Sequence, residues 1–259
     1  MAINNISVYK YLVKEKLRKY VHPNIYKKAI EIFEERKKFY TRFLTANDLV
    51  FDVGANMGNR VEVFLSLKNK VVAVEPQDYC NSFLKLKFSN SIKLVKCALG
   101  SKKETSLMYI NSKATTISSL SKEWIEGVKN GRFKNHEWNE TQQVEVDTLD
   151  NLIKQFGVPK FIKIDVEGFE IEVLKGLSHA VQIISFEYTI PEQKENVFLC
   201  LNQLNAISQN YVFNFSMDES NEFVLSKWLN YDEFIISIKS NENHLGGFGD
   251  IYASQKPLN

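Results

Sequence analysis

Beyond residue 48, short aliphatic and β-branched runs alternate along the chain with longer stretches whose apolar residues recur at helical spacing. This alternation is typical of βα units, in which helices connect parallel strands. The run from Val71 to Val74 is apolar throughout, which indicates a strand buried on both faces. We therefore predict an α/β fold with a mostly parallel, doubly wound sheet. Strands are predicted over residues 49–53, 71–75, 92–96, 161–165 and 181–187, and helices over residues 57–66, 79–88, 169–175 and 193–208.

Residues 1–45 follow a different pattern, because apolar positions recur at near-helical spacing among many Lys and Glu residues. One or two amphipathic helices are expected here, interrupted near Pro23. A basic amphipathic helix can lie on an anionic membrane. Packing against the main domain is the favoured alternative, because Glu31, Glu34 and Glu35 dilute the positive charge. The chain is thus divided into an N-terminal helical extension and a main domain over residues 46–259.

Two segments of the main domain do not fit the repeating unit. A short strand over residues 106–110 precedes a polar, lysine-rich stretch, which we interpret as an inserted lid over about residues 111–142. A helix over residues 149–156 then resumes the pattern. Near the end of the chain, residues 234–239 fit a helix or a strand, and residues 248–254 predict a final antiparallel strand.

Composition narrows the classes of function. Lys and Arg total 33 and Asp and Glu total 31, so a net charge of +2 gives no reason to expect nucleic acid as a partner. A hydrophobic fraction of 44% excludes a mainly disordered chain. The three cysteines lie far apart without CxxC spacing, which predicts no disulfide framework or zinc site and favours a cytoplasmic location. No apolar run reaches the length of about 18 residues that a membrane span requires.

The most informative segment runs from Leu49 to Gly58. A buried strand ends in Asp52 and Val53, and Gly54 opens a turn into a helix. Glycine lets the backbone approach a ligand closely, and a helix N-terminus offers free N–H donors. The next strand ends in Glu75, about 20 residues after Gly54, which is the spacing at which a carboxylate reaches a ribose hydroxyl.

The glycine spacing distinguishes between classes of cofactor. Gly54-x-x-x-Gly58 lacks the GxGxxG pattern of dinucleotide-binding proteins, because Asn56 occupies the place of the second glycine. An NAD-dependent oxidoreductase is therefore the less favoured alternative. No GK[ST] follows, which excludes a P-loop. Asp52 would repel a phosphate but suits a cationic nucleoside such as S-adenosylmethionine, whose amino group and sulfonium are positive.

On these residues the chain resembles the FkbM-type family of class I S-adenosylmethionine-dependent methyltransferases. The resemblance implies a Rossmann-like, seven-stranded sheet and O-methylation of a hydroxyl on a sugar, glycan or secondary metabolite. The motifs that carry it are Asp52-Val53-Gly54-Ala55-Asn56-x-Gly58, Glu75-Pro76, Cys97-Ala98-Leu99-Gly100, Asp147-Thr148-Leu149-Asp150, Ile164-Asp165-Val166-Glu167-Gly168-Phe169-Glu170, Phe186-Glu187 and Gly249-Asp250-Ile251-Tyr252-Ala253.

The resemblance also implies where the cofactor binds. The glycine turn surrounds its methionine part, Glu75 holds the ribose hydroxyls, and the Cys97-Ala98 backbone borders the adenine. The expected cofactor-binding residues are Asp52, Gly54, Asn56, Gly58, Glu75, Pro76, Cys97, Ala98 and Asp165.

Three further acids are candidates for catalysis. Asp165 and Glu167 follow the fourth predicted strand and Glu187 ends the fifth, at the sheet edge where α/β proteins bind ligands. A carboxylate there can accept the acceptor's proton, and Glu167 is the first candidate for that base. The three acids could instead bind Mg²⁺ or hold loops, and no metal site is predicted. Glu170 and Glu172 are expected to be first-turn acids of a helix.

The lid offers weaker candidates. His136 is an alternative base, and the remaining histidines have no metal-ligand spacing. Trp124, Phe133 and Trp138 either line an acceptor platform or fasten the lid to the sheet. The basic residues of the lid either meet an anionic acceptor or form a solvated face; they are Lys122, Lys129, Arg132 and Lys134.

A protein of another class stays open as an alternative. The fold could serve a non-catalytic binding module that acts through its N-terminal helices, which could also form a homo-oligomer. The presence of Asp52, Glu75 and Asp165 argues against such a loss of catalysis. The expected partner is therefore a small-molecule or glycan acceptor.

Overall fold

A computed structural model describes residues 5–240 and 245–258. The N-terminal segment forms two helices, α1 (Asn5–Val21) and α2 (Pro23–Tyr40), as its apolar spacing predicts. Pro23 stands in the first turn of α2, where its missing N–H costs no hydrogen bond. The buried end of α2 packs on the main sheet through Phe39 and Tyr40. The proposed boundary after residue 45 stays a prediction.

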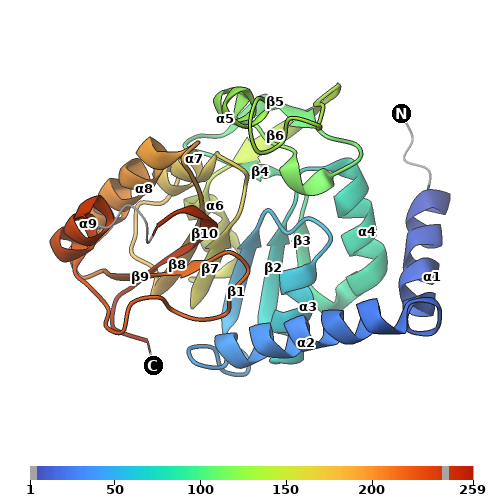
Figure 1. The fold of residues 1–259 in the computed structure, drawn as a ribbon, viewed down its shortest axis with the longest axis horizontal. Coiled ribbons are helices and arrows are strands. Elements are labelled where there is room, and N and C mark those ends of the chain that lie inside the picture. The colour runs from blue at the N-terminus through green and yellow to red at the C-terminus, as the bar shows by residue number, and fades with distance from the viewer. Residues whose placement is uncertain (1–4, 241–244, 259) are drawn as a thin grey trace.

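The central sheet confirms the predicted fold class (Figure 1). It has seven strands in the order β3-β2-β1-β7-β8-β10-β9. The last strand along the chain, β10, lies between β8 and β9 and runs antiparallel to both. The strands are β1 (Leu49–Val53), β2 (Lys70–Val74), β3 (Lys93–Val95), β7 (Phe161–Ile164), β8 (Ile183–Ile190), β9 (Val212–Met217) and β10 (Gly247–Ser254).

Helices cover both faces of this sheet, which explains its continuously apolar strands. Side chains of β1 alternate between two cores: Phe51 and Val53 face one, and Val50 faces the other. One core is closed by α6 (Leu149–Phe156), α7 (Glu170–Lys175), α8 (Lys194–Ile207) and α9 (Tyr231–Ser240), and the other by α2, α3 (Asn59–Ser66) and α4 (Asp78–Phe88). The segment that fitted a helix or a strand is thus helical, and it packs Phe234 on Phe213.

A second, three-stranded sheet lies above the carboxyl ends of the central strands (Figure 1). It has the order β4-β6-β5, with β4 (Ala98–Leu99), β5 (Glu104–Ile110) and β6 (Glu140–Asp147). The polar pattern did not predict this sheet, because only Val144 and Val146 of β6 are buried. The strand β6 begins at Glu140 and therefore overlaps the end of the stretch over about residues 111–142 that was assigned to the lid.

The lid proper connects β5 to β6 and contains η2 (Thr115–Ile117) and α5 (Lys122–Val128). Its aromatic residues hold it together, since the Trp124 ring lies 6.1 Å from Trp138 and 5.9 Å from Phe133. Trp138 also donates a hydrogen bond to the carbonyl of Ile117. These contacts join parts of the lid to one another, and a role of the aromatic residues toward the acceptor or the sheet stays a prediction. Among the described helices, none combines the length and the apolar character needed to cross a membrane.

Candidate functional site

A cavity of about 180 Å³ opens where β1, β2 and β7 end beneath the lid. Parallel strands bring their carboxyl ends to one sheet edge, so residues distant in sequence meet there. The sequence-predicted residues that line the cavity are Gly54, Asn56, Glu75, Pro76, Cys97, Ala98, Asp165, Glu167 and Glu187.

Gly54 lies where the turn after β1 meets the loop after β7. Its φ is +82°, a conformation that side chains disfavour, and a Cβ there would lie 1.8 Å from the Asp165 carbonyl oxygen. The amides of Gly54 and Ala55 both donate to the Val74 carbonyl, which ties the turn to β2. The turn therefore requires glycine, because the Asp165 backbone occupies the place of a side chain and packs directly against Gly54.

Glu75 follows β2 directly and holds the same turn from the other side. Its two carboxylate oxygens accept N–H bonds from Asn56 and Gln77, each at 2.8 Å. Burial raises the pKa of Glu75 to about 7, although these two hydrogen bonds oppose the shift. Each oxygen keeps a further lone pair, so the carboxylate can still accept hydrogen bonds from hydroxyl groups.

The cavity has an apolar side next to Glu75. Pro76, Cys97, Ala98, Leu99 and Met108 line it. Burial raises the pKa of the Cys97 thiol to about 12, so this side chain is neutral at physiological pH. An apolar wall beside a carboxylate that can accept hydrogen bonds suits the two parts of a nucleoside, a flat base and a ribose.

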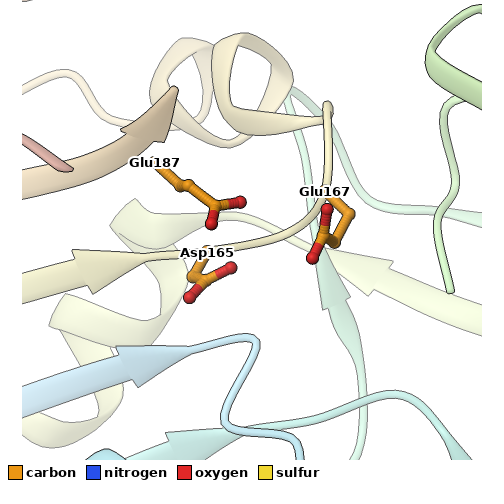
Figure 2. A group of neighbouring side chains, drawn as sticks. All are labelled: Asp165, Glu167 and Glu187. Carbon is orange, nitrogen blue, oxygen red and sulfur yellow. The ribbon is translucent and has the colours of Figure 1, made fainter. Parts of the chain in front are cut away.

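Three acids of the cavity lining lie close together (Figure 2). Carboxylate oxygens of Asp165, Glu167 and Glu187 all lie within 4.8 Å of one another. Burial, and then the neighbouring charge of Asp165, raise the pKa values of Glu167 and Glu187 well above the ordinary range. Like charges this close favour sharing of a proton among them.

The loop that carries these acids is held in an unusual conformation. Glu167 has a φ of +53°, in the left-handed region. Its carbonyl accepts a 2.6 Å hydrogen bond from the Ser119 hydroxyl of the lid. The buried Glu170 carboxylate accepts N–H bonds from Val166 and Gly168. Glu170 is thus a first-turn acid that holds the loop, and the lid fixes the loop from above.

Sequence reasoning missed a buried lysine beneath the acids. Lys163 on β7 is 2% exposed, and its ammonium lies 3.0 Å from Asp165 and 3.1 Å from Asp250. Burial opposes the charge, but the two carboxylates raise the pKa of Lys163 well above its usual value. The sequence does contain a signal for this buried ion pair, because Lys163 stands in a strand of otherwise apolar residues.

The structure separates three predicted residues from this cavity. Asp52 is buried in β1 beside Lys163, and burial raises its pKa to about 6. Gly58 begins α3 and lies against Phe88. His136 lines another hollow within the lid.

Further lining residues come from segments without a recognisable motif. Thr116, Ser118 and Leu120 belong to the lid, and Glu219 follows β9. The Glu219 carboxylate pairs with Arg36 of α2 at 2.6 Å and with Arg60 of α3 at 3.1 Å. Partial burial opposes ionisation, yet the two arginines lower the pKa of Glu219 to about 2. The N-terminal extension is thereby connected to the cavity wall.

Comparison with solved structures finds distant resemblances across most of the chain. A precorrin-6y C5,15-methyltransferase from Geobacter metallireducens has 11% identity over 86% of this chain and 88% of that chain, with a TM-score of 0.43. A TehB-like SAM-dependent methyltransferase from Corynebacterium glutamicum has 8% identity over 98% of this chain and 100% of that chain, with a TM-score of 0.46. No curated protein sequence matches.

Comparison with protein families is more informative. The family model described as the methyltransferase FkbM domain matches residues 52–225, which is more than half of the chain. The match extends from the end of β1 beyond Glu219 and so includes all the acids that line the cavity. The chain belongs to the FkbM family of S-adenosylmethionine-dependent methyltransferases.

Proposed function

We propose that the protein methylates a hydroxyl oxygen of a neutral small molecule, sugar or glycan. The observation that carries the proposal is the composition of the cavity lining. Gly54 and Glu75, which suit a nucleoside cofactor, line the same cavity as the acids Asp165, Glu167 and Glu187. Family membership implies S-adenosylmethionine as the methyl donor, and this layout supplies separate places for a cofactor and for proton transfer.

The residues present suit that cofactor. The Glu75 carboxylate accepts ribose hydroxyls, and Pro76, Cys97 and Ala98 border the base. The methionine part is proposed to lie along the turn at Gly54, where its positive groups are favoured near the Asp165 carboxylate. When bound, S-adenosylmethionine supplies an electrophilic methyl group.

The acids supply the proton acceptor that O-methylation needs. A hydroxyl oxygen must lose its proton as it gains a methyl group, and Glu167 is the proposed acceptor of that proton. Burial and the charge of Asp165 raise the pKa of Glu167, which makes its carboxylate a stronger proton acceptor. Asp165 is held next to Glu167 by the Lys163 ammonium, and Glu187 completes the cluster.

The charges around the cavity favour a neutral acceptor. Five acids and no Lys or Arg are among the described residues that line the cavity, so an anionic acceptor would be repelled. The charge of Glu219 is itself balanced by Arg36 and Arg60, and the repulsion therefore comes from the other acids. Two basic residues of the lid are already engaged, since Arg132 pairs with Glu192 and Lys129 pairs with Glu126. We also propose a cytoplasmic location, which the unpaired thiols of Cys80, Cys97 and Cys200 support.

The proposal is tested by following S-adenosylhomocysteine release with a panel of sugars, glycans and phenols. Glu167→Gln should lower kcat by about a hundredfold or more while the affinity for S-adenosylhomocysteine stays unchanged. Glu172→Gln is the matched control, because this acid of α7 pairs with Lys175 and Ser101 and does not line the cavity. An undiminished kcat in Glu167→Gln would refute the role of the base.

Two outcomes distinguish the alternatives. Turnover that EDTA abolishes and Mg²⁺ restores would assign the three carboxylates to a metal ion. Cofactor binding without transfer to any acceptor class would favour a non-catalytic module.

A further inference from the structure

Helix α1 carries an apolar stripe that faces away from the domain. Its side chains are Tyr9, Val13, Leu17, Tyr20 and Val21, with exposed fractions from 43% for Val13 to 73% for Tyr20. Intervals of three and four residues place them along one side of the helix. A contiguous exposed apolar surface of this kind marks an interaction site.

The stripe is not the face that attaches α1 to the rest of the protein. Val8 is fully buried, and the Tyr11 ring packs edge-on against Phe83 of α4 at 5.4 Å. Figure 1 shows α1 at the outer edge of the molecule, beside α4 and the start of α2. The helix therefore has two apolar sides: one packs against α4, and the other stays largely exposed in the part of the chain that the structure describes.

Positive charges flank the stripe. Lys10, Lys14 and Arg18 follow one side of it at four-residue intervals, and Lys19 lies on the other side with its ammonium 4.7 Å from the Tyr20 ring centre. The sequence of α1 contains five Lys or Arg residues and a single acid, Glu15. Cations on both margins of an apolar stripe characterise helices that lie in the interface of an anionic bilayer.

The beginning of α2 extends the same surface. A hollow of about 520 Å³ lies between the two helices. Its apolar lining includes Val13, Leu17, Val21 and Ile25, and its basic lining includes Lys14 and Arg18. Apolar groups with cations beside them match the acyl chains and anionic headgroups of a lipid surface.

We propose that α1 docks the protein on an anionic lipid bilayer, with its apolar stripe at the level of the headgroups. Charge complementarity favours this occupant over a second copy of the chain. A symmetric pairing of two α1 helices would bring together two surfaces with the same excess of cations. Tyrosines near both ends of the stripe suit an interface that is apolar on one side and wet on the other.

The test uses the full chain and vesicle co-sedimentation. One set of vesicles is pure phosphatidylcholine, and the other contains about one third phosphatidylserine. The wild-type protein should partition at least about tenfold more strongly to the anionic vesicles, and added salt should weaken the binding. Val13→Glu with Leu17→Glu, and separately Lys10→Glu with Lys14→Glu and Arg18→Glu, should each remove this binding.

Ile236→Glu is the matched control, because Ile236 is a 65% exposed apolar residue on α9, at the opposite side of the molecule (Figure 1). It should leave vesicle binding unchanged. Circular dichroism and S-adenosylhomocysteine affinity check that every variant is folded. Equal partitioning of the wild type to both kinds of vesicle, or undiminished binding by the α1 variants, would overturn the proposal. A wild-type dimer that Leu17→Glu dissociates, without vesicle binding, would assign the stripe to a second copy.

Discussion

The ammonium of Lys163 lies 3.0 Å from the carboxylate of Asp165, and both belong to the strand and loop that bring catalytic candidates to the cavity. The same ammonium lies 3.1 Å from Asp250 on β10. One buried cation thus connects a cavity residue to a strand from the far end of the chain. Because the charge of a buried lysine is tolerated only with such partners, each group depends on the others.

Replacing this lysine should therefore destabilise the protein. Lys163→Met leaves Asp250 and Asp165 without their cation, and the free energy of unfolding should fall by about 3 kcal/mol. Urea denaturation measures the change. Lys160→Met is the control, because Lys160 is half-buried just before β7, and its effect should stay below about 1 kcal/mol. Equal effects of the two substitutions would contradict the assigned role of Lys163.

The turn at Gly54 should tolerate no side chain. In Gly54→Ala the new methyl group collides with the Asp165 carbonyl, so the turn must move, and S-adenosylhomocysteine should bind at least about tenfold more weakly. Calorimetric titration measures the affinity. Gly131→Ala is the matched control, because no atom lies within 4 Å of the added Cβ. Unchanged affinity in Gly54→Ala would show that this turn is not part of the cofactor site.

Cofactor affinity should depend on pH through Glu75. Its pKa of about 7 means that protonation begins near neutrality, and the protonated carboxyl loses acceptor capacity toward ribose hydroxyls. The affinity for S-adenosylhomocysteine should fall about tenfold between about pH 8 and about pH 6. In Glu75→Gln the affinity should be low and this pH dependence should disappear. A pH dependence that persists in the variant would have another origin.

The same shift has an opposite consequence for stability. The folded-state pKa of Glu75 is raised above the ordinary value of 4.5 by burial, so the folded protein binds more protons than the unfolded chain between that value and about 7. The contribution of Glu75 to the free energy of unfolding should therefore decrease as pH rises through this window. Comparing urea denaturation of the wild type and Glu75→Gln at several pH values isolates this contribution.

The acid cluster should titrate as a coupled group. Glu187→Gln removes a like charge next to Glu167, so the pKa of Glu167 should decrease. Carbon-13 NMR of labelled glutamate carboxyl groups follows this titration, and Glu167→Gln assigns the signal. A Glu167 titration that does not respond to Glu187→Gln would mean that the two carboxylates do not interact.

The local pattern was sufficient to predict most of the fold. Buried parallel strands are continuously apolar, so β1 and β2 were found within one residue of their observed ends. The small sheet was missed because β6 is largely exposed and its first four residues are polar. A strand without a buried face has no alternation that separates it from a loop.

The cofactor side of the site was predictable for a different reason. Backbone geometry requires Gly54, hydrogen bonding requires Glu75, and both residues lie just after the ends of consecutive strands. Such requirements fix the residue type and its spacing in the sequence, and a motif results. Glu219 and Ser119 reach the site through tertiary packing of loops, which leaves no local pattern. Asp52 shows that the spacing of a motif does not determine where a side chain points. The side-chain alternation of β1 turns Asp52 away from the cavity toward Lys163.

Calorimetric titration of the purified protein with S-adenosylhomocysteine, beside a titration with NADH, tests whether the cavity at Glu75 binds this cofactor. We expect one site per chain for S-adenosylhomocysteine, at least about tenfold weaker binding in Glu75→Ala, and no binding of NADH. Binding of NADH in place of S-adenosylhomocysteine, or equal affinity of the wild type and Glu75→Ala, would contradict this expectation.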